Sequence, residues 1–394
     1  MIVFYNPQVD DFLAEPPHFS FLKRRALKKY GYIFNGILSE NEIIEIYVDF
    51  TLSAFIPENI FSKLPLIFRK LIVKRELSKW IKDNKLENKI KINFNYNNSF
   101  ENKILFAMSY KSMENYNESR INIINKFKKS IFHLSHYHIS TKLKSKNLSL
   151  LKNVYLCGDS DITSNDYFKF YFSWYKKDFL IIPFYVQDRF ICKKDFLERK
   201  DLAIATGSFH NLYEEKPVYK YKDYLDFYKQ STYHPIRKIL YENKNKVNEF
   251  IDVKVSPYRE NSNNNFLIKL FKKYFVNQKK YFAFDIVELY NQYKYVVVGE
   301  ENIGFPAIGA FEAMACGCIL IGQKEYYNSL GMEENIHYIS YDGNLNDLIE
   351  KIKYLKNNLE FSEEISNNGR TIIKNLFSKN KCYKNFKYRI INEK

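Results

Sequence analysis

The residues best suited to chemistry lie between Gly299 and Gly322. Five of the chain's 12 glycines fall there, together with Ala307, Ala310, Ala313 and Ala315. This pattern predicts a strand, a glycine-containing loop and a helix that begins near Ala307. The free N–H groups and positive dipole end of such a helix suit a phosphate group. Glu312, inside this helix, has the chemistry to accept hydrogen bonds from a ribose diol. The alternative is an ordinary helix–strand unit whose small residues serve packing.

A histidine cluster is the second candidate. His133, His136 and His138 lie within six positions. If the segment is extended, alternation places His136 and His138 on one face. The local sequence offers no clear further zinc ligand. We therefore expect either core or surface histidines, or one that lines a substrate site.

Further candidates are a short acidic motif, a glycine pair and a basic pair. Asp159-Ser160-Asp161 matches a D-x-D metal motif, although Asp and Ser also favour turns and caps. Gly207 and Ser208 are expected to form a turn after a strand, facing a ligand, or a plain turn. Arg237 and Lys238 follow a proline that starts a helix, and a helix start alone explains that proline without any ligand.

Short β-rich runs alternate with helical patterns along the chain, which predicts βαβ units and parallel sheets. We expect strands at 43–50, 89–94, 103–108, 130–134, 154–157, 179–184, 201–206, 250–255, 294–298, 318–322 and 336–340. We expect helices at 66–82, 118–129, 137–151, 235–246, 284–292, 308–315 and 345–355. The fold class is α/β, with two Rossmann-like domains facing each other across a cleft. Ligands of such sheets bind at the carboxyl ends of the strands.

The segment from Glu301 to Cys318, with Phe311-Glu312-Ala313-Met314-Ala315-Cys316-Gly317 at its centre, resembles the nucleotide-sugar signature of GT-B glycosyltransferases of the group 1 type. The resemblance implies an acceptor-binding domain at 1–190, a nucleotide-sugar-binding domain at 191–378 and a helix at 379–394 that packs back on the first domain. It implies sugar transfer, without metal or other cofactor, from a nucleoside diphosphate sugar to a glycan or lipid-linked acceptor in surface polysaccharide synthesis. The implied donor-binding residues are Gly207, Ser208, Arg237, Lys238, Gly304, Phe305, Pro306, Ala307, Ile308, Gly309 and Glu312; the implied catalytic residues are His133, His136, His138 and Glu301.

The chain departs from the family pattern in one respect. Ten residues separate Glu301 from Glu312, where the family has seven, and position 304 is glycine. Glu312 therefore matches the ribose-binding glutamate, whereas the first glutamate matches Glu301 or Glu300 only loosely. A retaining mechanism is expected, and an inverting transferase, fucosyltransferase-like or CMP-sugar-dependent, is the alternative.

The composition and the charge of the chain limit the partners that it could bind. The 394 residues carry a net charge of +16, which favours an anionic partner and keeps a nucleic-acid-binding protein as a rival reading. Five scattered cysteines and no signal peptide indicate a cytoplasmic protein. Leu66–Lys82 combines apolar and basic residues, as a helix at the inner face of an anionic membrane does. A core helix with a solvated basic face is the alternative.

Overall fold

The computed structural model describes residues 1–5, 31–49, 64–83, 85–94, 100–108, 113–114, 116–215, 217–258 and 285–392. The chain forms two compact units. Unit 1 contains Met1–Asp159, Lys169–Tyr185 and Cys382–Lys394, and unit 2 contains Ser160–Phe168 and Val186–Lys381. The sequence predicts a boundary at 190/191, and the chain passes from unit 1 into unit 2 between Tyr185 and Val186. The sequence does not predict that 160–168 belongs to the second unit.

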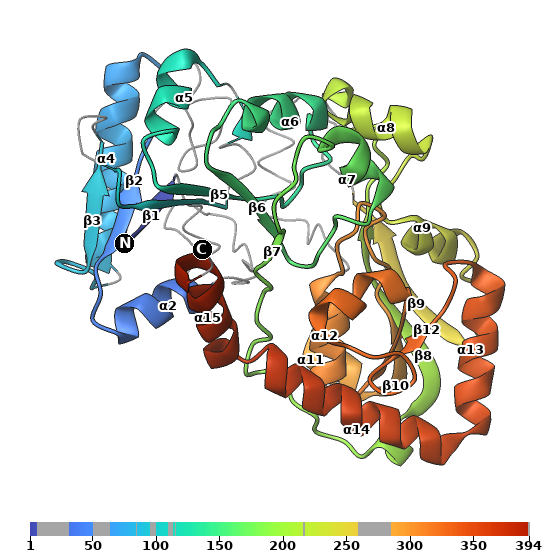
Figure 1. The fold of residues 1–394 in the computed structure, drawn as a ribbon. Helices are drawn as coiled ribbons and strands as arrows, with labels where there is room; N and C mark the ends of the chain where they lie inside the picture. Colours follow the sequence, from blue (N-terminus) through green and yellow to red (C-terminus); the bar gives the residue numbers. More distant parts are fainter. Residues whose placement is uncertain are drawn as a thin grey trace, which may run out of the picture. The chain divides into compact units, whose positions relative to one another are not determined.

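Unit 1 is built on a seven-stranded parallel sheet with the order β3-β2-β1-β4-β5-β6-β7 (Figure 1). The strands are β1 (Ile2–Tyr5), β2 (Ile44–Tyr47), β3 (Ile90–Asn93), β4 (Ile104–Ala107), β5 (Lys129–His133), β6 (Val154–Gly158) and β7 (Leu180–Ile181). The strand order reverses between β1 and β4, as in a Rossmann sheet. Central β1 is missing from the sequence-based assignment, because four residues at the chain's start are too few to show a period.

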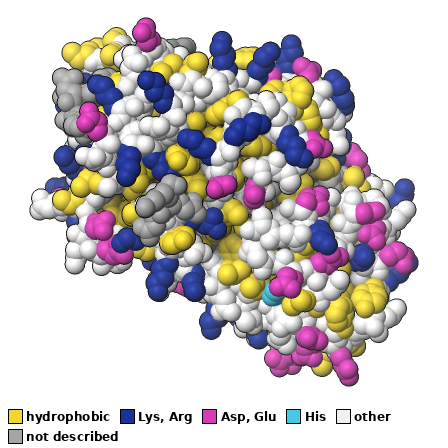
Figure 2. Space-filling model, in the orientation of Figure 1, with side chains coloured by type: hydrophobic (Ala, Val, Ile, Leu, Met, Phe, Trp, Pro, Cys, Tyr) yellow, Lys and Arg dark blue, Asp and Glu magenta, His cyan; other side chains and the backbone are white. Residues whose placement is uncertain are grey.

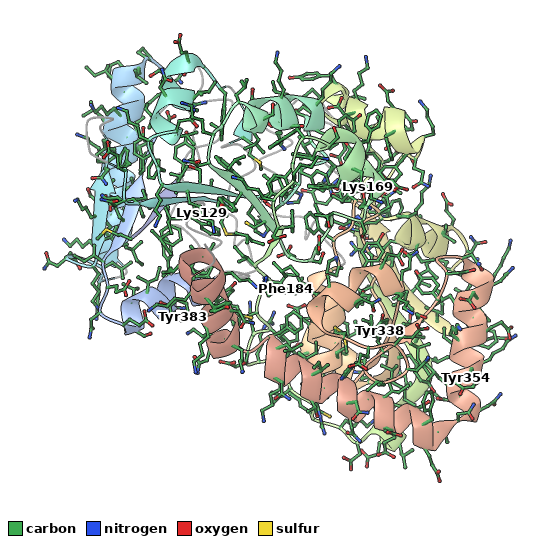
Figure 3. The ribbon with its side chains drawn as sticks, viewed as in Figure 1. Lys129, Lys169, Phe184, Tyr338, Tyr354 and Tyr383 are labelled. Atoms are coloured by element: carbon green, nitrogen blue, oxygen red, sulfur yellow. The ribbon has the colours of Figure 1, made fainter. Side chains whose placement is uncertain are left out.

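The helices of unit 1 are α2 (Gly31–Ser39), α4 (Leu66–Asp83), α5 (Glu118–Ile124), α6 (Thr141–Ser149) and α15 (Lys379–Lys387), and α7 (Asp166–Tyr171) crosses from unit 2. Helix α15 packs on α2, with the Tyr383 ring against Gly36. The Tyr383 hydroxyl, on a side chain labelled in Figure 3, donates to Glu40 Oε2 at 2.9 Å. Lys387 Nζ lies 2.6 Å from the same oxygen. A π-helical turn, Tyr388–Asn392, follows α15.

Unit 2 is built on a five-stranded parallel sheet with the order β12-β11-β10-β8-β9. The strands are β8 (Lys200–Phe209), β9 (Ile251–Pro257), β10 (Tyr293–Val297), β11 (Ile319–Gly322) and β12 (Ile339–Ser340). The helices are α8 (Lys222–Tyr228), α9 (Pro235–Glu242), α11 (Ile286–Asn291), α12 (Ile308–Ala315), α13 (Leu345–Asn357) and α14 (Leu359–Leu376). Numbered within the unit, the order is 2-1-3-4-5. Its switch point, where ligands bind in such sheets, lies between β8 and β10.

Both sheets are parallel and both units alternate strands with helices, so the predicted α/β class with two Rossmann-like domains is confirmed. One element of the prediction is wrong. β8 does not end at Thr206 but continues to Phe209, pairing Gly207 with Val255 and Ser208 with Ser256. The turn expected at Gly207 is therefore strand, and the connection to α9 starts at residue 210. Within the described residues, no helix is long and apolar enough to cross a membrane.

Candidate functional site at the strand ends of unit 2

Arg237 of α9 bridges the two strand ends at the switch point. Its Nη1 donates to the Ser208 carbonyl oxygen at 2.9 Å, and its Nη2 donates to the Val298 carbonyl oxygen at 3.3 Å. A Cβ at Gly207, whose φ is +122°, would lie 2.9 Å from Arg237 Cζ. Gly207 is therefore needed because the guanidinium occupies the space of a side chain. The structure thus brings Gly207, Ser208 and Arg237 together, although not through a turn.

Lys238, the other member of the predicted basic pair, points elsewhere. Its Nζ donates to Ser231 Oγ at 3.0 Å and lies 3.8 Å from Glu242 Oε1. Adjacent positions on a helix project in different directions, since each residue turns the chain by about 100°. Of the two, Arg237 is the one that donates to the strand ends of the switch point.

The residues after β10 form a tight loop that leads to α12. Glu301 N donates to the Phe305 carbonyl oxygen at 3.0 Å, and Gly304 N donates to the Glu301 carbonyl oxygen at 2.9 Å. Gly304 has a φ of +101°, and a Cβ there would lie 2.8 Å from the Ile162 side chain. The loop thus needs glycine at 304 for both its backbone conformation and its packing.

Residues 160–168 hold this loop in place. Ser160 Oγ donates to the Gly304 carbonyl oxygen at 3.0 Å, and Asn165 Nδ2 donates to the Asn302 carbonyl oxygen at 3.0 Å. Tyr228 of α8 donates to the same Asn302 oxygen at 2.6 Å. Sequence reasoning missed these residues, because their partners lie more than 70 positions away.

The N-terminus of α12 lies beside the end of β10. Ala307, which follows Pro306, is the N-cap residue, with an extended backbone and no side-chain cap within the described residues. Ile308 and Gly309 form the first turn, and a Cβ at Gly309 would lie 3.0 Å from both Tyr290 Oη and Val298 Cγ1. Glycine here lets the first turn approach the strand closely, as in dinucleotide-binding turns.

Two carboxylates predicted to contact the donor lie on this part of unit 2. Glu312, on α12, is 6% exposed. Glu301, at the start of the loop, has its Oε1 3.8 Å from Nε2 of His234, the N-cap residue of α9. A role for His234 beside Glu301 could not be read from the sequence, since 67 positions separate the two.

The three histidines of unit 1 do not form one face. His133 ends β5, is fully buried and accepts from Ser135 N through Nδ1 at 3.2 Å. Its Nε2 lies 3.7 Å from Asp159 Oδ1. The assumption of an extended segment is wrong, because His136 has a φ of +53° and the chain turns there. The rings of His136 and His138 are still near each other, with centroids 5.8 Å apart.

The two aspartates of the D-x-D motif fall in different units. Asp161 Oδ1 accepts from Thr163 N at 2.9 Å and from Thr163 Oγ1 at 2.7 Å, which is a turn-forming arrangement. Among the described residues, no group of three or more His, Cys, Asp or Glu side chains is arranged to hold a metal ion.

The chain is similar to known proteins both in part of its sequence and in its fold. Residues 270–385, of which 270–284 lie outside the described part, match the family described as glycosyl transferase-like. No curated protein matches the chain significantly. Similar solved structures include a glycosyltransferase from Rickettsia africae, with a TM-score of 0.52, 13% identity, and coverage of 100% of this chain and 99% of that one.

Two further structures are similar over nearly the whole chain. Sucrose-phosphate synthase from Thermosynechococcus elongatus has a TM-score of 0.54 and 10% identity, covering 98% of this chain and 96% of that one. HepE from Anabaena, solved with UDP-glucose, has a TM-score of 0.52 and 11% identity, with 97% of each chain covered. The family match covers residues 270–385 alone, and it is a match to a glycosyltransferase family. The three solved structures, at 10–13% identity, show that the chain shares the fold of such enzymes, with two Rossmann-like units.

Proposed function

We propose that the protein transfers a sugar from a nucleoside diphosphate sugar to a glycan or lipid-linked acceptor in surface polysaccharide synthesis. The observation that carries the proposal is the α12 N-terminus, uncapped by any described side chain, in a unit whose switch point is bridged by Arg237. Helix N-terminal N–H groups and a guanidinium are both suited to phosphate oxygens. That the similar HepE structure contains UDP-glucose supports a sugar nucleotide as donor.

In this proposal the donor diphosphate lies along Gly304–Gly309, and Glu312 accepts hydrogen bonds from the ribose hydroxyls. Unit 1 binds the acceptor, and one of His133, His136 and His138 contributes to the reacting centre. Glu301 contacts the donor sugar. A retaining reaction is the preferred course, and an inverting reaction is the alternative, because Glu301 matches the retaining pattern only loosely. The family match favours this enzyme over a nucleic-acid-binding protein.

Catalysis would rest on orientation and on stabilising the charge of the departing diphosphate. The α12 N-terminus and Arg237 would supply that stabilisation without a metal ion. Activity should therefore survive EDTA and the Asp161→Asn substitution. Loss of activity under chelation, restored by manganese, would contradict this part of the proposal.

The donor site is tested by calorimetry with UDP and UMP on Arg237→Gln. If Arg237 contacts the second phosphate, UDP affinity should fall by about tenfold, since one charge-assisted hydrogen bond contributes about 1.5–3 kcal/mol. UMP affinity should change less. Lys238→Gln is the matched control, because it is the next residue on α9 and its Nζ contacts Ser231 and Glu242. Equal losses for UDP and UMP would show that Arg237 does not contact the second phosphate.

If no sugar nucleotide raises the Tm of the wild type in a thermal-shift panel, the proposed function is contradicted.

We further propose that α4 contacts an anionic membrane surface. Leu66, Ile67, Phe68 and Leu71 are each more than half exposed, whereas Val73 and Leu77 are buried. The helix therefore anchors in unit 1 through one part and presents apolar side chains through another. Lys74, Arg75, Lys79 and Lys82 are also exposed, and Figure 2 shows hydrophobic side chains with Lys and Arg beside them over α4. Apolar side chains flanked by cations suit a lipid interface.

A further inference from the structure

Glu300, which no part of the proposed function uses, is buried at the strand ends of unit 2. It follows β10 and directly precedes the loop that starts at Glu301. Its side chain is 4% exposed, whereas the neighbouring Glu301 side chain is 22% exposed. The two adjacent glutamates thus have different surroundings, because Glu300 is buried and Glu301 Oε1 lies 3.8 Å from His234 Nε2.

The Glu300 carboxyl group connects β10 with the segment that follows β11. Its Oε1 accepts from the Tyr327 hydroxyl at 2.7 Å and from Gln323 N at 3.2 Å. A Cβ at Gly322, the last residue of β11, would lie 2.7 Å from the same oxygen. Glycine at 322 thus makes room for the carboxyl group directly over the end of β11. These contacts hold the ends of β10 and β11 together. The loop 301–305, which we call the donor loop because the proposed function places the donor beside it, begins directly after Glu300.

The surroundings of Glu300 favour a neutral carboxyl group. Its Oε2 is buried and has no hydrogen-bond partner among the described residues, and no described Lys, Arg or His pairs with it. Burial raises the pKa of Glu300, against which the Tyr327 hydroxyl acts only in part. An ionised carboxylate without a cation is costly to bury, and a protonated one is much less so.

The groups that face Glu300 come from each neighbouring element. Tyr326 and Glu325 belong to the 3-10 helix Lys324–Tyr326, Tyr327 follows it, and Tyr341 follows β12. Tyr338, labelled in Figure 3, precedes β12. Burial raises the pKa of Tyr326, Tyr327, Tyr338 and Tyr341, and an ionised Glu300 would raise each of these pKa values further. Glu325, the one carboxylate of the group, raises the pKa of Glu300 further.

We propose that Glu300 is a positioning residue for the donor, whose neutral carboxyl group ties the end of β10 to the segment after β11 and keeps negative charge away from the diphosphate. The effect on the diphosphate rests on the proposed function, whereas the connection between β10 and the segment after β11 does not. When Glu300 ionises, a negative charge appears one residue before the donor loop and weakens the binding of a polyanion. The connection to Tyr327 and Gln323 persists in both states, so ionisation changes charge rather than removing the hydrogen bonds.

Protonation is tested on the free protein by thermal unfolding across about pH 5 to pH 9. A carboxyl group whose pKa is raised on folding stabilises the protein fully below its unfolded value of about 4.5, and this stabilisation is lost as pH rises through the folded value. The wild type should therefore lose stability with rising pH relative to Glu300→Gln, with Tm values diverging by about 3 °C or more. Glu249→Gln, the control at an exposed glutamate of unit 2, should follow the wild type.

The same variants separate positioning from structural support. Calorimetry with UDP should show wild-type affinity falling by about threefold more than that of Glu300→Gln between the acidic and the alkaline end of the same pH series, a difference of roughly 0.7 kcal/mol. Parallel Tm profiles for wild type and Glu300→Gln would overturn the neutral carboxyl. Diverging Tm profiles with parallel UDP affinities would overturn the effect on the donor. If UDP binds to none of the proteins, the donor part of the inference fails together with the uridine donor, and the Tm profiles still decide the protonation state.

Tyr327→Phe provides a second variant in case Glu300→Gln does not fold. The Tyr327 hydroxyl lowers the pKa of Glu300, so its removal should move the pH-dependent loss of stability to higher pH. A loss that stays at the wild-type pH would show that Glu300 is not the titrating group, and the inference would be overturned.

Discussion

A buried arginine lies near the strand ends of each unit, and the two arginines bind different acceptors. In unit 1, Arg120 Nε and Nη2 donate to Asp49 Oδ2 at 3.0 and 2.8 Å, and Tyr5 of β1 donates to the same oxygen at 3.1 Å. In unit 2, Arg237 donates to the carbonyl oxygens of Ser208 and Val298. Both arginines are less than a tenth exposed. The first holds a carboxylate and the second holds two strand ends. Similar sheets with similar burial thus use arginine for an ion pair in one unit and for a backbone bridge in the other.

The largest expected effect separates these two uses. Arg120→Met leaves the Asp49 carboxylate buried without its cation, and such losses cost about 3–5 kcal/mol of stability. Arg237→Gln leaves carbonyl oxygens without a donor, which costs about 1–3 kcal/mol. Urea unfolding of Arg120→Met can be followed by tryptophan fluorescence, because both tryptophans, Trp80 and Trp174, belong to unit 1. For Arg237→Gln, which alters unit 2, far-ultraviolet circular dichroism reports the transition.

Lys387→Ala is the control for general loss of a cation in this experiment, because it lies in unit 1, where the tryptophans report unfolding. Its Nζ lies 2.6 Å from Glu40 Oε2 with both side chains partly exposed, and exposed pairs contribute about 0–1 kcal/mol. If Arg120→Met costs no more than Lys387→Ala, the buried ion pair does not stabilise unit 1, and the comparison between the two arginines is wrong.

Sequence periodicity was sufficient for most elements of unit 2 and for the strands of unit 1 beyond β1. The helix 308–315 has the predicted bounds, α13 continues two residues beyond the predicted 345–355, and the strands differ by a few residues at their ends. Continuous apolar runs such as Val296–Val298 are a local signal, since a parallel strand is buried on both faces. The family-like segment around Glu312 is local as well, which is why the loop and the helix that follow β10 could be predicted from the sequence.

The remaining features depend on contacts between distant positions. The role of Ser160 and Asn165 in holding the 301–305 loop requires partners more than 130 positions away. Gly207 could not be assigned to a strand because glycine is rare in strand interiors, and its space is occupied by an arginine from α9. Glu300 and Glu301 are adjacent and chemically alike, so only the fold distinguishes the buried one from the other.

The second prediction concerns the nucleotide affinity of unit 2, where Glu312 is proposed to accept hydrogen bonds from the ribose. Two charge-assisted hydrogen bonds are at stake, each contributing about 1.5–3 kcal/mol. Glu312→Ala should therefore weaken nucleotide binding by about tenfold or more, and Glu312→Gln by less, because one acceptor remains. Calorimetry with ribo- and 2′-deoxyribonucleotides on wild type and Glu312→Ala completes a double-mutant cycle. The deoxy ligand should lose little further affinity in the variant. Additive losses in a folded variant would exclude Glu312 from the ribose site.

The smallest expected effect concerns α4 of unit 1, whose exposed apolar side chains set it apart from the helices around the donor site. Ile67 is 66% exposed, so Ile67→Ser should leave stability within about 0.5 kcal/mol of the wild type. If Ile67 enters a lipid interface, the same substitution should weaken binding to vesicles of anionic lipid by roughly fivefold, which corresponds to about 1 kcal/mol. Cosedimentation with such vesicles measures this binding, and UDP affinity should be unchanged.

Leu197→Ser, at a side chain of unit 2 that is 61% exposed, controls for general loss of surface hydrophobicity. Equal effects of the two substitutions would mean that α4 is not the lipid-binding surface. Binding should also weaken with salt, because the screening length falls to about 3 Å at 1 M, and a salt-independent affinity would assign the contact to apolar side chains alone.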